Sequence, residues 1–353
     1  MRYDDLYVSG AGSWYPESIS VDDAVADGRY SATVRSRTGQ RRVTIAGPGD
    51  ASPDMAVRAG ISALGRAGRD PAEVSLLLHA VATYNGMDGW NCASYLQHRI
   101  LAGHGVSFEV RQLSNGAVGA IELAAAYLRS GGGAGSALIT TADQFAMPAW
   151  NRWEASPGLV FGDGASALLL SRDSGFARVV SSVSVCDPEL EGMQRGTRPF
   201  RPFADPEFLP SSVIERTKEF AATMSIEEAV GRMAVGLNRA VTEAAKEAGT
   251  SVEDVAHVVL PNFGRELLHD ECLVPIGVDI ERTTWQWGRT VGHVGAADQF
   301  GGLDHLATQG LLTPGERVML VGVGGGFNWT CAVLEILTEP GWADPASGSG
   351  DAA

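Results

Sequence analysis

The chain has 353 residues, of which 44% are hydrophobic and 20% are charged. These proportions are typical of globular proteins, and the length predicts two domains or one large two-lobed unit. The formal net charge of −15 argues against nucleic acid or an anionic membrane as the main partner, because both require clustered positive charge. The N-terminus lacks an apolar signal core, and no stretch of about 20 apolar residues occurs. We therefore expect a cytoplasmic protein.

Short apolar runs alternate with Ala-rich helical patterns along the chain. Helices are expected at 55–68 and 117–131, and strands at 74–83, 166–172 and 255–261. An uninterrupted short apolar run is typical of a strand that is covered on both faces. The alternation of such strands with helices predicts a layered α/β fold.

The order of elements repeats in the second half of the chain. The corresponding segments are 55–80 and 233–261, 108–128 and 283–307, and 136–145 and 316–327. Self-similarity at this period indicates two similar lobes. We predict an N-terminal half at 1–172 and a C-terminal half at 173–340. The second half includes a long loop at 187–212, and a disordered tail follows at 341–353.

Several kinds of site are excluded by pattern. The Gly-rich segment GVGGGF (322–327) is followed by a further strand pattern rather than a helix, so it does not fit a dinucleotide-binding fingerprint. The seven histidines show no metal-ligand spacing, and the four cysteines form no CxxC pair. We expect no metal site, and we expect the cysteines to be small buried residues in a reducing compartment.

Two equivalent turns, one in each half, carry candidate reactive groups. Ser114 lies between an apolar strand and an Ala-rich helix, where backbone N–H groups favour developing negative charge. His293 lies at the matching turn of the second half, and Asp298 follows five residues later. Serine, histidine and a carboxylate together can form an activated hydroxyl nucleophile. The residues alone leave other interpretations open: Ser114 as a helix cap, His293 as a core histidine and Asp298 as a solvated carboxylate.

Five segments resemble the β-ketoacyl-ACP synthase III family of the thiolase superfamily. RTGQRRV (37–43) resembles its RTGIxxRRI, and NCASYLQHRI (91–100) resembles its STAxxVQxxL. SNGAVGA (114–120) resembles its nucleophile segment CSGFxxA. FGDGASALLL (161–170) and GVGGGFNWT (322–330) are the most specific matches, to FGDGAGAVVL and GFGGGFTWG. The resemblance implies a duplicated thiolase-like fold of five layers, α/β/α/β/α, and a homodimer.

Three family positions are occupied by other residues. Ser114 stands where the family has its nucleophilic cysteine, Asn262 where it has its catalytic histidine, and His293 where it has its catalytic asparagine. Asp298 ends the GHVGAAD motif that contains His293. This set resembles a divergent serine branch from antibiotic and polyketide pathways, which includes the daunorubicin-type starter-unit enzyme. A serine hydroxyl, unlike a thiol, needs a general base, so the added histidine and aspartate form a coherent change.

The resemblance implies an acyltransferase that moves a short or aryl acyl group through an acyl-serine to a carrier protein or a hydroxyl acceptor. The backbone N–H groups of Ser114 and Gly326 would form the oxyanion hole, and Asn262 would donate a further hydrogen bond. Two alternatives are a starter-unit ketosynthase that condenses with malonyl-ACP by decarboxylation, and a non-catalytic partner subunit of a synthase complex.

The resemblance also implies a donor and its binding residues. The donor would be an acyl-carrier-protein or coenzyme A thioester, a substrate rather than a tightly bound cofactor. Thr33 stands near the position where the family often has a tryptophan that stacks on the adenine of coenzyme A, which favours a carrier-protein donor. Arg37 belongs to a local basic cluster, which also fits a solvated or salt-bridged face. Met87 and Trp90 are expected to shape the acyl pocket.

Overall fold

The computed structural model describes residues 1–101, 103–130, 135–200, 206 and 209–342. The strands are β1 (Tyr7–Trp14), β2 (Ser18–Ser20), β3 (Arg42–Thr44), β4 (Val74–Ala80), β5 (Val106–Val110), β6 (Ser136–Asp143), β7 (Gly164–Ser171), β8 (Ala177–Cys186), β9 (His257–Val259), β10 (Arg317–Gly324) and β11 (Asn328–Ile336). The larger helices are α3 (Ser52–Ala67), α4 (Cys92–Ile100), α5 (Gly116–Arg129), α7 (Val213–Phe220), α8 (Ile226–Glu247) and α12 (Asp298–Thr308). Shorter helices are α1 (Val21–Ala26), α2 (Ala32–Thr38), α6 (Gly192–Arg195), α9 (Arg265–Leu268), α10 (Val274–Ile276) and α11 (Trp285–Gly288).

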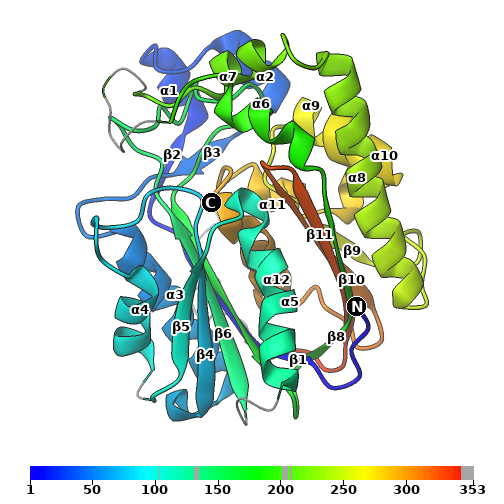
Figure 1. Ribbon diagram of the computed structural model, residues 1–353. Helices are drawn as coiled ribbons and strands as arrows, with labels where there is room; N and C mark the ends of the chain where they lie inside the picture. The colour runs from blue at the N-terminus through cyan, green and yellow to red at the C-terminus, as the bar shows by residue number, and fades with distance from the viewer. Residues whose placement is uncertain (102, 131–134, 201–205, 207–208, 343–353) are drawn as a thin grey trace, which may run out of the picture.

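Nine strands form one sheet in the order β5-β4-β6-β7-β1-β8-β11-β10-β9, and β2 pairs with β3 separately (Figure 1). β5, β4 and β6 are parallel neighbours, whereas β7 and β1 are antiparallel to the strands beside them. Within the named strands, β1 and β8 form two residue pairs, Tyr7–Arg178 and Val8–Ala177. The segment before β1 extends this contact, because the N–H of Tyr3 donates to the carbonyl oxygen of Val180 at 2.9 Å. The sheet therefore consists of two halves joined by a short strand pairing.

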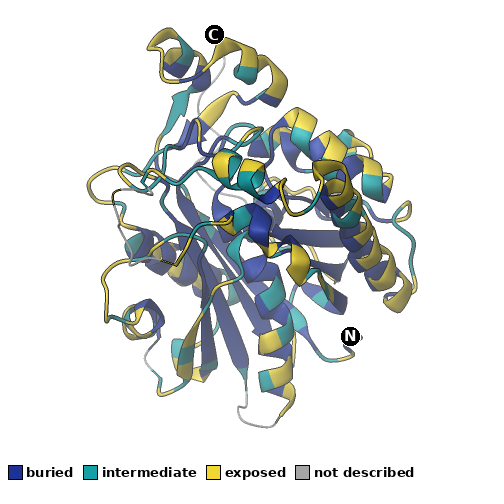
Figure 2. Cartoon of the chain, turned by 45° about the horizontal axis from the view of Figure 1, so that its top comes forward, coloured by how far each residue is buried: buried dark blue, intermediate teal, exposed yellow. Residues whose placement is uncertain are grey.

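The helices complete five layers, as expected. α3 packs on the outer face of the first half-sheet, α5 and α12 lie between the two half-sheets, and α8 covers the outer face of the second (Figure 1). Figure 2 shows the resulting gradient: the strands are buried and the outward face of α8 is exposed. The duplicated thiolase-like α/β arrangement predicted from the repeat and the resemblance is confirmed.

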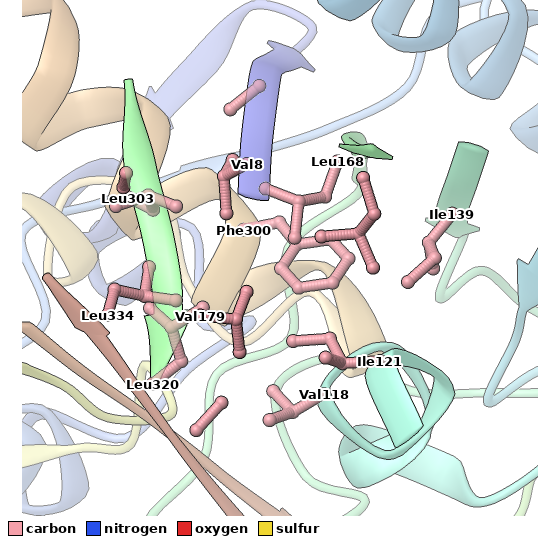
Figure 3. Packing of buried hydrophobic residues seen from close by; sticks show 14 of the residues in the cluster. Val8, Val118, Ile121, Ile139, Leu168, Val179, Phe300, Leu303, Leu320 and Leu334 are labelled. Atoms are coloured by element: carbon pink, nitrogen blue, oxygen red, sulfur yellow. The ribbon is translucent and has the colours of Figure 1, made fainter. Parts of the chain in front are cut away.

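The middle layer contains a hydrophobic core that both halves share. Val118 and Ile121 of α5 lie in one cluster with Phe300 and Leu303 of α12 and with strand residues such as Leu320 (Figure 3). All five side chains are fully buried. Because each middle helix begins at one of the two candidate turns, this core sets the distance between the turns.

Local sequence explains where the main helices begin and end. α3 has a proline in its first turn and ends at Gly68, whose φ of 60° is left-handed. Ser225 caps α8 by accepting a hydrogen bond from the N–H of Glu228. Gly236 within α8 is required by packing, because a Cβ there would lie 2.4 Å from the ring of the buried Trp329.

Two predicted irregular segments differ in part from the expectation. The 187–212 segment begins with a 3₁₀ turn (Pro188–Glu191) and α6, and buries Leu190 and Met193 in the core beneath α8. Its residues 201–205 and 207–208 lie outside the described part of the chain. Of the predicted tail, 343–353 lie outside it as well, whereas Trp342 packs against Phe176 with ring centroids 4.9 Å apart. Among the described residues, no helix has the length and apolar character needed to cross a membrane.

Candidate active site

Ser114 occupies a sharp strand-to-helix connection. It lies in a 3₁₀ turn (Leu113–Asn115) between β5 and α5 and is partly exposed. The preceding residue, Leu113, has a φ of +48°, which is strained for a side chain of this kind and is typical of functional turns. The N-cap of α5 is Asn115, and it makes no side-chain capping bond. Ser114 therefore does not serve as the helix cap that the residues alone left open.

His293 holds the Ser114 hydroxyl. The Ser114 Oγ lies 2.8 Å from Nε2 of His293, and Nδ1 of His293 lies 2.5 Å from Oδ2 of Asp298. The imidazole is buried between the rings of Phe161 and Phe263, at centroid distances of 5.6 and 5.4 Å. The structure thus brings the three predicted residues into one chain of hydrogen bonds, from an accessible hydroxyl to a buried carboxylate.

The carboxylate of Asp298 is fully buried at the N-terminus of α12, where the helix dipole favours negative charge. Besides the imidazole, it accepts hydrogen bonds from the backbone N–H of Val294 at 2.8 Å and of Asn262 at 2.8 Å. These bonds fix the carboxylate, so it can orient the imidazole and stabilise its protonated form.

Asn262 has a different place from the one predicted. Its side-chain amide nitrogen donates to Oδ1 of Asp298 at 3.1 Å and to the carbonyl oxygen of Gly292 at 3.0 Å. Both amide hydrogens are therefore committed, and Asn262 supports Asp298 rather than offering a hydrogen bond to an acyl oxygen. Position 288 must be glycine for this arrangement, because a Cβ there would lie 2.3 Å from Oδ1 of Asn262.

The Gly-rich turn at 322–327 packs directly on the Ser114 turn. A Cβ at Gly324 would lie 2.4 Å from the carbonyl oxygen of Gln112, and one at Gly325 would lie 3.0 Å from Cδ1 of Leu113. Gly326 has a φ of 151°. Within the described part of the chain, the backbone N–H groups of Ser114 and Gly326 have no hydrogen-bond acceptor. The oxyanion hole expected from these two groups stays a prediction.

The two residues that are expected to shape the acyl pocket differ in exposure. Met87 is 64% exposed, and Trp90 packs on Gly86 and on Tyr95, at a ring distance of 5.5 Å. Both lie on the segment between β4 and α4, at the surface of this chain.

One arginine of the predicted basic cluster pairs with a carboxylate, and two arginines from other parts of the chain add to the cluster. Thr33 and Arg37 are exposed on α2, and Arg37 pairs with Glu266 at 2.6 Å. Arg289, which stacks on Trp285 at 4.4 Å, lies in the positive field of Arg41 and Arg265. Burial, and then this field, lowers the pKa of Arg289. Sequence reasoning missed Arg265 and Arg289, because they are distant in the chain from the RTGQRRV segment.

The described residues contain no group of three or more His, Cys, Asp or Glu side chains arranged to hold a metal ion. Cys92, Cys272 and Cys331 are buried, Cys186 is exposed, and all four are free thiols. Burial raises the pKa of Cys92 and of Cys331 to about 12. These thiols therefore stay protonated, so they cannot replace the missing family cysteine as a nucleophile.

The family models and the relatives that match this chain belong to one enzyme family. The 3-oxoacyl-[acyl-carrier-protein (ACP)] synthase III model matches residues 108–188, and its C-terminal model matches 245–336. The β-ketoacyl-[acyl-carrier-protein] synthase III of Rhizobium meliloti (strain 1021) is 28% identical over 336 residues, covering 93% of this chain and 98% of the relative.

Solved structures agree as well. ChlB3, described as an acyltransferase, is 35% identical, with a TM-score of 0.91 over 96% of this chain and 100% of ChlB3. The 3-oxoacyl-(acyl carrier protein) synthase III, FabH, from Pseudomonas aeruginosa PAO1 is 24% identical, with a TM-score of 0.77 over 95% of this chain and 99% of the other, a likeness of fold. From fold, motifs and full-length similarity together, the chain belongs to the 3-oxoacyl-[acyl-carrier-protein] synthase III family of thiolase-superfamily enzymes.

Proposed function

We propose that this protein is an acyltransferase that carries a short or aryl acyl group on Ser114, as a step of secondary metabolism. The observation that carries the proposal is the continuous contact from the Ser114 Oγ through the imidazole of His293 to Asp298, at 2.8 and 2.5 Å. A general base within hydrogen-bond reach of a hydroxyl, and itself held by a buried carboxylate, is what an acyl-serine mechanism requires.

The proposed reaction has two transfers. Nε2 of His293 takes the proton of Ser114 as Oγ attacks the thioester carbonyl, and the N–H groups of Ser114 and Gly326 stabilise the oxyanion. The C–S bond then breaks, and the imidazolium returns its proton to the leaving thiolate. In the second half, His293 deprotonates the acceptor, the acceptor attacks the acyl-serine, and Ser114 recovers its proton.

Plain acyl transfer is preferred to decarboxylative condensation for two reasons. Condensation in the family uses a histidine and an asparagine side by side at the substrate, whereas both amide hydrogens of Asn262 are already bonded here. In addition, ChlB3 is described as an acyltransferase and is 35% identical over its whole length. Condensation with malonyl-ACP and a non-catalytic partner role are the alternative outcomes of the test below.

The donor in this proposal is a thioester of an acyl carrier protein or of coenzyme A, as is usual for the family. Arg41, Arg265 and Arg289 form a positive surface on a chain of net charge −15. Such a surface can attract a phosphopantetheine phosphate or an acidic carrier protein. In this proposal, Thr33 and Arg37 on the neighbouring α2 also contact the donor. We propose a cytoplasmic location for this activity as well.

A homodimer is also part of the proposal. β5 is the edge strand of the sheet, and its Val106 and Phe108 are 41% and 55% exposed. An exposed apolar edge strand is a template for pairing with a second chain. Met87, 64% exposed, would then meet the partner rather than solvent. Light scattering is expected to give twice the chain mass for the wild type and a monomer for Phe108→Lys.

Intact mass spectrometry tests the function. The protein is incubated with acetyl-, propionyl- and benzoyl-CoA and with the matching acyl-carrier-protein thioesters. We expect a mass gain of one acyl group in the wild type and none in Ser114→Ala. Labelling that persists in Ser114→Ala contradicts the assigned nucleophile, and no labelling with any donor favours the non-catalytic role. Release of CO₂ from malonyl-carrier protein by the acylated enzyme favours condensation.

A further inference from the structure

A second buried carboxylate, outside the triad, lies against the turn that carries His293 and Asp298. Asp143 is the last residue of β6 and is fully buried. No salt bridge within the described ranges involves it. Its partners are backbone and hydroxyl donors, and burying an unpaired carboxylate is costly. Burial raises the pKa of Asp143 to about 6, although these hydrogen bonds oppose the shift.

One oxygen of Asp143 holds the segment that follows β4. Oδ1 accepts hydrogen bonds from the backbone N–H of Ala82 at 2.9 Å, and from the N–H and the Oγ1 hydroxyl of Thr83 at 2.7 and 2.8 Å. β4 and β6 are parallel neighbours, so their carboxyl ends lie at the same end of the sheet. β5, the other parallel neighbour of β4, ends there too, and the Ser114 turn follows it.

The other oxygen, Oδ2, also accepts from the N–H of Ala82, at 3.2 Å, and it faces the turn of the second half. Oδ2 lies 3.4 Å from the backbone nitrogen of Ala296, which donates to it. A Cβ at Gly295 would lie 2.3 Å from Oδ2, and Gly295 has a φ of 56°. The carboxylate therefore rests directly on the backbone between His293 and Asp298.

We infer that Asp143 is a positioning residue, which fixes the His293–Asp298 turn against the strand ends of the first half and so sets the distance from His293 to Ser114. The inference rests on the proposed function and deepens it. The Ser114 turn also lies close to Ala296. A Cβ at Gly116, two residues after Ser114, would lie 3.8 Å from Cβ of Ala296. Asp143 touches neither the hydroxyl nor the imidazole, so its effect would act through the turn.

Asp143→Asn separates the two sides of the carboxylate. The asparagine Oδ1 can still accept the three hydrogen bonds from Ala82 and Thr83. Its Nδ2 would then face the N–H of Ala296, placing donor against donor at the turn that carries His293; it would also face the N–H of Ala82, whose bond to Oδ1 remains. Thr83→Val is the matched control, because it removes a hydrogen bond from the same carboxylate on the side away from the turn.

The test follows the acylation burst with p-nitrophenyl acetate and with acetyl-CoA. We expect Asp143→Asn to keep the full burst amplitude and the KM, while its acylation rate constant falls about 10- to 100-fold, as small misplacements of a catalytic group do. Thr83→Val is expected to stay within about threefold of the wild type, since its loss is one peripheral hydrogen bond. A wild-type rate constant in Asp143→Asn, an equal loss in Thr83→Val, or a reduced amplitude at an unchanged rate constant would each overturn the inference.

Three further variants show whether a failed result comes from misfolding, from the positioning role or from the proposed function. Should Asp143→Asn fail to fold, Gly295→Ala displaces the same oxygen from the turn side and is expected to give the same slow burst of full amplitude. A wild-type rate in that variant rejects the positioning role. Ser114→Ala and His293→Ala are measured beside them. A burst that survives in both, or no burst in the wild type, means that the proposed function itself has failed.

Discussion

The turns at Ser114 and His293 occupy equivalent places in the two halves, yet they are built in opposite ways. The Ser114 side chain is partly exposed, follows a strained Leu113 and makes one side-chain hydrogen bond, to His293. The His293 turn is buried, and the backbone of His293 is fixed on both sides by bonds to Val160 and Gly162 at 2.8 and 3.0 Å. The difference teaches that the fold fixes the imidazole of His293 and leaves Ser114 partly exposed, as the proposed acyl-serine mechanism requires.

The largest expected effect comes from removing either partner of the central contact. Ser114→Ala and His293→Ala should each lower acyl transfer by at least about 10³-fold, since residues of one triad act as a unit. Rapid-quench acylation measures this loss. The double variant should be no slower than either single variant. Additive losses would mean that the two side chains act separately.

Asp298→Asn should come next. An asparagine there can donate to the imidazole as well as accept, which favours the wrong tautomer, and a loss of about 10²- to 10⁴-fold in kcat is expected. Circular dichroism should show an unchanged fold. Activity near that of the wild type would show that the buried carboxylate does not serve the imidazole.

Asn262→Ala should have a smaller effect, about 10-fold, because it removes one hydrogen bond to Asp298 while the bonds from Val294 and from the backbone of residue 262 remain. The expected loss is in kcat, with an unchanged KM for the donor. A loss that appears mainly in KM would instead indicate that Asn262 contacts the substrate directly.

The smallest effect concerns stability alone and involves the other fully buried histidine. His79 is held by Thr140 at 3.0 Å and by Asn85 at 2.8 Å, and burial lowers its pKa to about 3. The unfolded chain, with a pKa near 6.5, takes up a proton that the folded chain refuses, so stability should fall as the pH drops from 6.5 toward 3. Urea unfolding at pH 7 and pH 5 measures this fall, which should be smaller in His79→Gln. An equal fall in both proteins would assign it to other groups.

The sequence was sufficient for the layered fold and for the pairing of Ser114 with His293. The fold follows from buried strand runs and an internal repeat, and the pairing follows from the equivalence of two turns. It was not sufficient for Asn262, whose role depends on which way its amide points. It was also insufficient for Asp143 and Phe161, because nothing local to these residues indicates that they meet a turn of the other half. Nothing local to Phe263 indicates that its ring packs on His293.

Met87 and Trp90 illustrate a further limit. The resemblance implied that they shape the acyl pocket, and this stays a prediction, since Met87 is 64% exposed on this chain and Trp90 packs on Tyr95. Cross-linking with a photoreactive acyl donor tests whether either residue lines the pocket.

Because β1 and β8 pair over a short length, the central helices α5 and α12 provide much of the contact between the two half-sheets. The buried apolar residues that α5 and α12 contribute to the middle layer therefore also hold the two half-sheets relative to each other. Ile121 and Phe300 are among these residues, and they follow Ser114 and Asp298 by seven and two positions. Loss of a methylene there should lower the acylation rate as well as the free energy of unfolding, because the packing of the two helices sets the distance between the two turns.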